Sequence, residues 1–297
     1  MLVAIVSSRS AALLTLFGAL VSPAFAVPVE PMVATPDGLR PQANIHAIPI
    51  GGSISHIGSD VHILAADGTV THIARNAGTR SATAALAKKT KREASGWVAW
   101  TGWLNTGLSP VSTFTSTWSV PPVPVTYNSQ LLYLFNSFFS YDAKAIIQPV
   151  LQYGVSPAGG AQGHWAVASW YVTATSGFHS SLVNVSVGQV LNGSLSLLAQ
   201  NGSTYDYSSE FVGIPGTLLV VNNGPLLPGV SKTLETYGAT RKSDYPTGTT
   251  VFSNTDLKLE SGAAPGFVWN ITNDAADGHT AQVNVAGATN GEVTIVY

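Results

Sequence analysis

The feature that most constrains the fold of this chain is a succession of short apolar runs separated by turn residues, without a helical period of useful length. Residues 111–120 alternate apolar and polar side chains and stop before two prolines, as half-buried strands do. Residues 131–139 are denser in apolar and aromatic groups and are expected to form an inner strand. Three Asn-Gly pairs indicate hairpin turns, at residues 192–193, 201–202 and 290–291. The pattern predicts an all-β protein, an antiparallel double-sheet β-sandwich of the concanavalin-like or jelly-roll-like kind.

The composition excludes several kinds of chemistry. The 297 residues include no cysteine, which excludes a thiol nucleophile, a cysteine-ligated metal and disulfides. Only 9% of the residues are charged and 45% are hydrophobic, which argues against disorder. The formal net charge of −2 gives no reason to expect nucleic acid as a partner. We expect a monomer that is stabilised by core burial alone.

The first 26 residues have the pattern of a secretory signal peptide. Arg9 is their only charged residue, an apolar run lies at residues 11–21, and Ala24-Phe25-Ala26 is a small-x-small cleavage signal after Ala26. The apolar run is too short to span a bilayer, and Pro23 prevents its extension toward the cleavage signal. The chain is therefore expected to be secreted and extracellular, with no membrane partner after signal removal.

Residues 27–92 are expected to be a propeptide. They contain a predicted hairpin with its turn at Asp67-Gly68 and end in a basic cluster, residues 88–92, followed by Glu93-Ala94. This arrangement indicates kexin-type processing after Arg92, and the alternative is an exposed charged linker. The remaining 93–297 domain has five basic and eleven acidic residues, so a basic propeptide is expected over an acidic cleft. Four of seven histidines lie in the propeptide, which suggests release on acidification.

Several hydrolytic sites are missing from the sequence. It has neither a Gly-x-Ser-x-Gly nucleophile elbow nor a His-Glu-x-x-His zinc motif. His164, His179 and His279 are too scattered for a metal site and are interpreted as surface or structural residues. On one strand, Asp206 and Glu210 would lie about 13 Å apart, too far to act alone as a glycosidase pair. We expect no metal and no cofactor.

One amide and one carboxylate remain as candidates for hydrolysis. Gln152 stands in the apolar run 146–154, and Glu210 stands in a second β-type run. We predict that the two side chains meet across neighbouring strands. A carboxylate can act as general base on water and return the proton to the leaving amine, while an amide N–H stabilises the oxyanion. The alternatives are a satisfied core amide for Gln152 and an exposed strand residue for Glu210.

Five segments then match the motifs of a known family in order and spacing: Ser95-Gly96-Trp97, Trp118-Ser119-Val120-Pro121, Val150-Leu151-Gln152-Tyr153-Gly154, Ala168-Ser169-Trp170-Tyr171 and Ser209-Glu210-Phe211. Through them, most of residues 95–297 resembles the eqolisin-type glutamic peptidases, secreted acid peptidases found mainly in fungi. The resemblance implies a β-sandwich with a catalytic dyad on its concave sheet, formed here by Gln152 and Glu210. Val172 stands where the family has a glutamate.

The resemblance also implies residues that shape the substrate cleft. Trp170 and Tyr171 belong to a matching motif, and Tyr133 or Phe135 is expected to replace the family's substrate-side tryptophan. The predicted function is a secreted acid endopeptidase acting on protein or peptide substrates, with its own propeptide as a further partner. The alternatives are a catalytically weakened homologue, a lectin-like carbohydrate-binding sandwich, and a neprosin-like prolyl peptidase, for which no second glutamate matches. A Gln152 and Glu210 pair facing opposite sides of the sandwich would refute the proposed dyad.

Four Asn-x-Ser/Thr sequons are predicted glycosylation sites. They begin at Asn184, Asn192, Asn201 and Asn270. In a secreted chain such sequons are expected on exposed segments.

Overall fold

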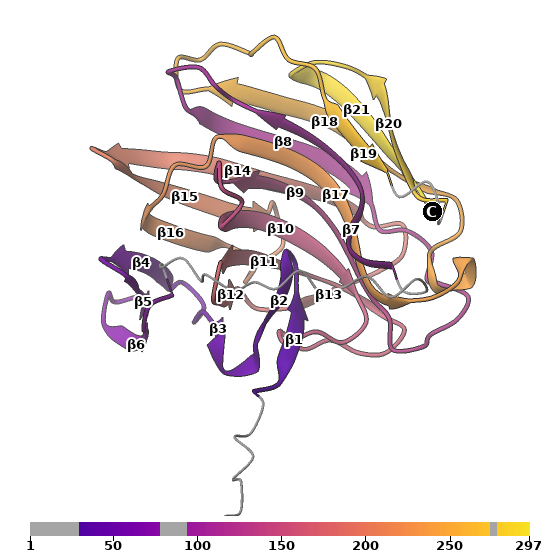
Figure 1. Ribbon diagram of the computed structural model, residues 1–297, viewed down its shortest axis with the longest axis horizontal. Helices are drawn as coiled ribbons and strands as arrows, with labels where there is room; N and C mark the ends of the chain where they lie inside the picture. Colours follow the sequence, from indigo (N-terminus) through magenta and orange to yellow (C-terminus); the bar gives the residue numbers. More distant parts are fainter. Residues whose placement is uncertain (1–29, 78–93, 274–277) are drawn as a thin grey trace, which may run out of the picture. The chain divides into compact units, whose positions relative to one another are not determined.

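Two large β-sheets make up most of the computed structural model, which describes residues 30–77, 94–273 and 278–297 (Figure 1). The described residues from Pro31 onward belong to one compact unit. The predicted signal peptide with its cleavage site at Ala26, the basic cluster and the processing site at Arg92 lie outside the described residues. Within the described ranges, no helix has the length and apolarity required to cross a bilayer.

The first sheet has nine strands and carries the candidate site. Its order is β19 (Asn270–Asn273), β7 (Ala94–Leu104), β17 (Gly229–Ala239), β9 (Leu131–Phe139), β10 (Ala145–Tyr153), β11 (Trp165–Thr173), β12 (Gly177–His179) and β3 (Ile45–Ala47), and β13 (Val183–Val185) also pairs with β11.

The second sheet has ten strands, which Figure 1 shows from the yellow strands at one edge to the indigo strands at the other. Its order is β20 (Thr280–Val285), β21 (Thr289–Val296), β18 (Thr249–Leu259), β8 (Val111–Ser119), β14 (Val190–Asn201), β15 (Thr204–Phe211), β16 (Leu219–Gly224), β4 (Ser53–Ile57), β5 (Asp60–Leu64) and β6 (Val70–Ala74). A separate hairpin consists of β1 (Met32–Thr35) and β2 (Gly38–Pro41), and two 3-10 helices are η1 (Gln42–Asn44) and η2 (Lys242–Asp244).

The prediction of an all-β sandwich is confirmed. Of the three hairpin turns predicted at Asn-Gly pairs, one is found and two are wrong. Residues 201–202 do connect β14 with β15. Residues 192–193 lie inside β14, and residues 290–291 lie inside β21, whose hairpin with β20 turns at residues 286–288. Asn290 has a φ of 55°, so the Asn-Gly pair marks an irregular position in the strand rather than its end.

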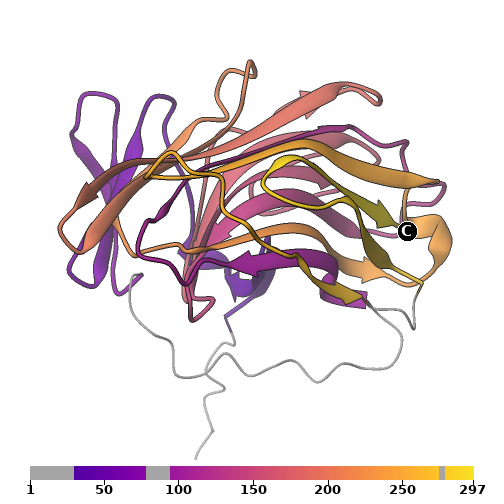
Figure 2. The ribbon, with the colours of Figure 1, turned by 90° about the horizontal axis from the view of Figure 1, so that it is seen from above.

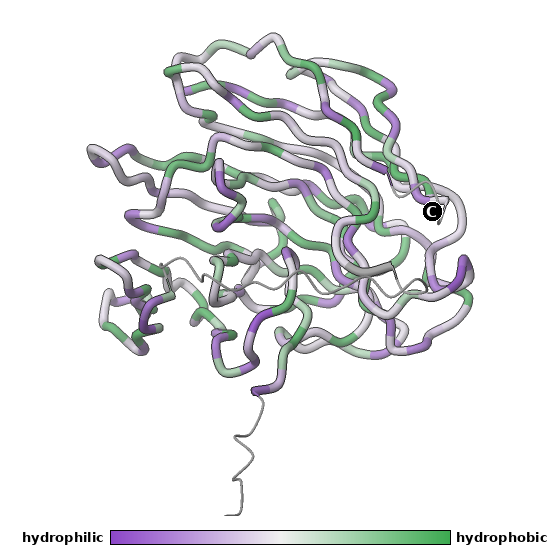
Figure 3. The backbone as a smooth tube through the Cα atoms, in the orientation of Figure 1, coloured by the Kyte–Doolittle hydropathy of each residue, from purple (hydrophilic) through white to green (hydrophobic). Residues whose placement is uncertain are grey.

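Each strand of the nine-stranded sheet has one side facing the interior of the sandwich and one facing outward. On β10, Leu151 and Tyr153 belong to the interior cluster, and the alternation turns Gln148, Val150 and Gln152 outward. The outward side is itself apolar and buried. Figure 3 shows hydrophobic residues recurring along the strands of both sheets. Its cluster consists of Leu131, Tyr133, Phe135, Ile146, Val150, Ala168, Trp170 and Val172.

The described part of the N-terminal segment adds strands to both sheets. Strand β3 pairs in parallel with β12, and β4 pairs in parallel with β16. Ile54, Val61 and Ile63 enter the interior core, so β4 and β5 complete one end of it. Figure 2, turned by 90°, shows the indigo strands continuing the edge of the sandwich. The predicted hairpin with its turn at Asp67-Gly68 is confirmed as β5–β6.

Candidate functional site

Gln152 and Glu210 do not meet, and the prediction that they lie on neighbouring strands is wrong. Gln152 is on β10 of the nine-stranded sheet, and Glu210 is on β15 of the ten-stranded sheet. The neighbour of Glu210, Ser209, points into the interior, where its hydroxyl donates to Ser169 Oγ of the other sheet at 3.0 Å. Because successive side chains on a strand alternate, Glu210 faces out from the far side of the sandwich. The two groups therefore face opposite sides, which refutes the dyad in that form.

Gln152 is a buried amide whose hydrogen bonds are made locally. Its Nε2 donates to the carbonyl oxygens of Gly154 at 2.8 Å and Gly159 at 2.9 Å. Its Oε1 accepts from Ser156 Oγ at 2.7 Å. Both N–H groups are thus engaged by main-chain carbonyls, and the side chain anchors the Gly-rich loop after β10. This is the alternative of a satisfied amide, and it leaves no donor for an oxyanion.

The nine-stranded sheet has a buried carboxylate that the sequence analysis missed, Glu235 on β17. Tyr133 of β9 lies in register with Gln152 on one side and with Glu235 on the other, so the three occupy one row across the sheet. Glu235 is fully buried. Its Oε2 accepts from the main-chain N–H of Asp37 at 2.8 Å, and its Oε1 accepts from that of Gly38 at 3.2 Å. Tyr237 Oη lies 2.5 Å from the same Oε1.

Burial raises the pKa of Glu235 to about 8, and the nearby charge of Asp37 acts in the same direction. The hydrogen bonds from Tyr237 and from two main-chain amides lower the pKa and offset only part of that effect. Burial also raises the pKa of Asp37 to about 7, although its side chain is 22% exposed and Arg40 opposes the change. With the hairpin in place, the raised pKa favours the protonated form of Glu235.

A second glutamine on β10, Gln148, reaches the same main-chain turn. Its Nε2 donates to the carbonyl oxygen of Pro36 at 2.7 Å. Gln148 is fully buried, and its Oε1 has no hydrogen-bond partner among the described residues. A buried carbonyl without a partner costs about 1–3 kcal/mol. Such a cost in a native protein calls for an explanation other than stability.

Gln148 and Glu235 together bracket one peptide bond, the bond between Pro36 and Asp37. The amide of Gln148 contacts the carbonyl oxygen of this bond, and the carboxyl of Glu235 contacts its nitrogen. An amide donor at the oxygen and a carboxyl at the nitrogen are the two groups that hydrolysis of a peptide bond requires. An amide and a carboxyl, the combination predicted for Gln152 and Glu210, are thus brought together as Gln148 and Glu235.

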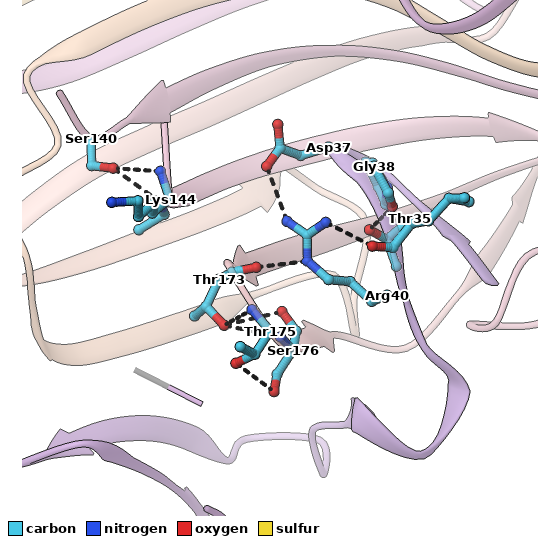
Figure 4. Close-up of polar contacts among 12 residues, drawn as sticks. Thr35, Asp37, Gly38, Arg40, Ser140, Lys144, Thr173, Thr175 and Ser176 are labelled. Carbon is cyan, nitrogen blue, oxygen red and sulfur yellow. Dashed lines mark hydrogen bonds and ion pairs between the residues drawn. The ribbon is translucent and has the colours of Figure 1, made fainter. Parts of the chain in front are cut away.

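The hairpin β1–β2 that carries this peptide bond is held on the outer side of the sheet by polar contacts. Tyr133 Oη donates to the carbonyl oxygen of Ala34 at 3.2 Å, and Tyr237 Oη lies 3.3 Å from that of Thr35. Figure 4 shows Arg40 between the turn and the end of β11, where its Nε donates to the carbonyl oxygen of Thr173 at 2.7 Å. The guanidinium also pairs with Asp37 at 3.4 Å.

A cavity of about 570 Å³ lies beside the hairpin. Its lining includes Ala34 of the hairpin, Ser156 of the loop after β10 and Tyr237 of β17. Tyr237 therefore connects the cavity with Glu235, which it contacts. The cleft thus extends past the hairpin along the outer side of the sheet.

The four residues expected to shape the cleft divide between the two sides of the sheet. Tyr133, Phe135 and Trp170 belong to the outward cluster beneath the hairpin. Tyr171 belongs to the interior core, and its hydroxyl lies 2.8 Å from Nε2 of His56 on β4. Its expected place in the cleft is therefore wrong, because alternation turns it away when Trp170 faces out. Val172 faces outward like Trp170.

The remaining predicted positions are the three histidines considered as metal ligands and the four glycosylation sequons. Across residues 30–77, 94–273 and 278–297, no cluster of three histidine or acidic side chains is arranged for a metal ion. His164 is exposed, whereas His179 and His279 are buried. Asn184, Asn192, Asn201 and Asn270 are all exposed, as their predicted glycosylation requires.

Comparison with known proteins gives matches only among solved structures, since no protein-family model and no curated protein matches the chain. Two crystal structures of scytalido-glutamic peptidase with transition-state analogues align with 69% of this chain and 99% of theirs, at 12% and 15% identity and a TM-score of 0.46. SCP-B, a member of the eqolisin family in complex with the tripeptide Ala-Ile-His, covers the same shares at 15% identity and a TM-score of 0.42. Alignments of this quality carry no functional conclusion for this chain.

Proposed function

We propose that this protein is a peptide-bond hydrolase of the glutamic type, with Glu235 as general base and acid and Gln148 as the oxyanion donor. The observation that carries the proposal is the peptide bond between Pro36 and Asp37, held with its oxygen on Gln148 and its nitrogen on Glu235. The motif resemblance to eqolisins supports the same chemistry, although it selected Gln152 and Glu210 for these roles.

In the proposed reaction, ionised Glu235 removes a proton from water as the water oxygen attacks the carbonyl carbon. Gln148 Nε2 donates a hydrogen bond to the oxygen that becomes negative, an effect worth about 3–4 kcal/mol in comparable sites. The C–N bond then breaks as Glu235 returns the proton to the amine nitrogen. Because burial is the largest cause of the raised pKa of Glu235, departure of the hairpin would lower it and let the carboxyl ionise at acid pH.

The N-terminal segment would keep the enzyme inactive until it is removed. Two main-chain N–H groups of the hairpin donate to the oxygens of Glu235, and Gln148 contacts the carbonyl oxygen of Pro36, so the hairpin holds the groups that a substrate needs. Secretion with cleavage after Ala26, processing after Arg92 and acid-pH activity belong to the same proposal. The described residues before Arg92 pack with the sandwich in one unit. In this proposal the 92–93 boundary is therefore a site of proteolytic processing and not a boundary between two folding units.

Digestion of casein at pH 2–5 in the presence of pepstatin tests the proposed function. The comparison uses the full chain opened by D37P, because proline cannot adopt the positive φ of Asp37 and the turn must then leave Glu235. D37P is compared with D37P/E235Q and with the matched variant D37P/E210Q, which alters a carboxylate on the other side of the sandwich. Loss of a general base is expected to lower the rate about 10²–10⁴-fold in D37P/E235Q. D37P/E210Q should cleave like D37P, and equal activity of D37P/E235Q and D37P would refute the proposal.

A further inference from the structure

Pro36 occupies the position in the cleft that defines the reacting bond. The residue is buried, and its carbonyl oxygen accepts from Gln148 Nε2. A proline has no main-chain N–H, so the cleft needs no hydrogen-bond acceptor for this residue. The only main-chain group through which this position can be held is therefore the carbonyl, which is the group attacked in hydrolysis.

The two residues before Pro36 approach as an extended peptide. Strand β1 ends at Thr35, and a residue before proline is restricted to extended conformations. Tyr133 Oη donates to the carbonyl oxygen of Ala34. The cleft thus contacts residues 34 and 36 through main-chain carbonyls, which any peptide sequence provides. Selectivity must come from the buried side chains of Thr35 and Pro36, and of these two the proline ring belongs to the residue with the attacked carbonyl.

From this arrangement we infer that the substrates are peptides with proline immediately before the bond that is cut. The inference rests on the proposed function and specifies its substrate class. The Pro36 position of the hairpin corresponds to the residue that supplies the attacked carbonyl, and the nitrogen of the following residue is the leaving amine. Water adds to the carbonyl carbon, the C–N bond breaks, and the proton held by Glu235 passes to that nitrogen.

The hairpin itself resists this reaction because the chain reverses directly after Pro36. Asp37 has a φ of 104°, which non-glycine residues rarely adopt, and Gly38 has a φ of 105°. The reversal brings both N–H groups onto the carboxyl of Glu235. A substrate that continues in an extended conformation supplies only one of them, leaving the other carboxyl oxygen to accept from water.

The first test measures cleavage of two fluorogenic peptides by the full chain opened by D37P, with G38P as a second opened variant. Proline cannot adopt the positive φ of either position, so the turn must leave Glu235. The peptides carry Ala-Thr-Pro-Ala and Ala-Thr-Ala-Ala. We expect kcat/KM for the proline peptide to be at least about tenfold higher, as for a filled apolar pocket. Equal or slower cleavage of the proline peptide, with Glu235-dependent casein cleavage intact, would overturn the inference and leave the proposed function standing.

The second test measures binding, which does not depend on turnover. The double variants D37P/E235Q and G38P/E235Q are titrated with the same two peptides by calorimetry. Tighter binding of the proline peptide, by about tenfold, is expected. Equal or weaker binding would reject the proline site even if neither peptide is cleaved. Proline-selective binding without any casein cleavage by the opened chain would instead reject the hydrolytic function.

Discussion

Two glutamines four residues apart on β10 differ in the partners that they find. Gln152 makes three hydrogen bonds within its own loop, whereas Gln148 makes one to the hairpin and keeps a buried carbonyl oxygen without a partner among the described residues. A buried amide with every group paired stabilises the fold. An unpaired buried oxygen is not by itself a sign of chemistry, since Asn136 Oδ1 also lacks a partner within the described part of the chain. The proposed chemical role of Gln148 therefore rests on its contact with the Pro36 carbonyl oxygen, whereas the loop bonds of Gln152 indicate a structural role.

Alanine substitutions should separate these two roles. Q148A in the D37P background is expected to lower kcat about 10²–10³-fold, as removal of one oxyanion donor does, with little change in unfolding free energy. Q152A should destabilise the chain by about 1–3 kcal/mol, because the loop groups that it pairs become unsatisfied. Urea unfolding and peptide cleavage measure the two effects. A larger loss of kcat in Q152A than in Q148A would contradict the assignment.

Sequence alone could identify the faces of β10 but not the strand that completes the site. The alternation around Leu151 and Tyr153 already turns Gln148 and Gln152 to one side. Glu235 carried little signal, because residues 229–239 are mostly small or polar in sequence although the structure buries nearly all of them. The placement of β17 beside β9 depends on pairing between distant segments, which local patterns do not encode. Motif matching therefore selected Glu210, on the wrong sheet.

At the scale of elements, the hairpin β1–β2 is held over the cleft by a small number of polar contacts. Arg40 fixes it to the end of β11 (Figure 4). The main-chain N–H groups of the turn residues Asp37 and Gly38 contact Glu235. A two-stranded hairpin has little stability of its own, so its position depends on these contacts. Weakening the turn should free the cleft without disturbing the sheets.

D37P is expected to make the full chain active at least about tenfold above wild type on casein, because the variant removes one N–H donor and forbids the positive φ. D67P provides the matched control, since it changes the exposed Asp-Gly turn of the β5–β6 hairpin outside the cleft. Similar activity of D37P, D67P and wild type would contradict inhibition by the hairpin.

The docking of the hairpin should also depend on the ionisation of Glu235. Its pKa is about 8 beneath the hairpin and is expected to fall toward the ordinary value of a glutamate once exposed, so the docked state binds more protons between about pH 4.5 and 8. Docking is therefore strongest below this window and weakens as pH rises through it. In E235Q this dependence should become weaker, and the part that remains is due to Asp37, whose pKa burial raises to about 7 in the docked hairpin. Hydrogen exchange of residues 33–38 at pH 5 and pH 8 measures it, and an equal pH response in E235Q would exclude Glu235 as its cause.

At the scale of the whole described unit, the N-terminal segment completes both sheets and buries histidines where it joins them. His56 of β4 contacts Tyr171, and burial lowers its pKa to about 4. His46 of β3 packs against His72 and Phe178, and burial followed by the charges of His72 and His179 lowers its pKa to about 4. The two histidines stabilise the docked segment only in their neutral forms, so their contribution increases as pH rises. The contribution of Glu235 decreases as pH rises, so the two effects oppose each other.

The sign of the histidine effect gives a prediction for acid conditions. A histidine with a lowered pKa contributes stability above about pH 6.5 that is lost as pH falls toward 4. H56Q retains a polar partner for Tyr171 but takes up no proton. The loss of unfolding free energy between pH 6.5 and 4 should therefore be smaller in H56Q, by at most about 3 kcal/mol. An identical loss in H56Q and wild type, measured by urea unfolding, would remove His56 from the acid response.

The all-β architecture could be predicted because the alternation of apolar and polar residues identifies a strand within a few residues. The pairing of the N-terminal segment with both sheets could not be predicted in this way. Residues 111–120 and 131–139 became β8 and β9 close to the expected limits. The segment before Arg92 was expected as a separable cover, and its parallel pairing with β12 and β16 had no sequence signal. Parallel pairs join distant segments, so their register is decided by burial of residues such as Ile54 in a core formed elsewhere in the chain.

The central claim is that one carboxyl and one amide on the nine-stranded sheet act on the same peptide bond, and a double-mutant cycle tests it directly. Groups that act as a unit are strongly non-additive, so Q148A added to E235Q in the D37P background should slow kcat/KM little beyond E235Q alone. The result that contradicts the account is full additivity of the two losses, or a loss in E210Q as large as that in E235Q.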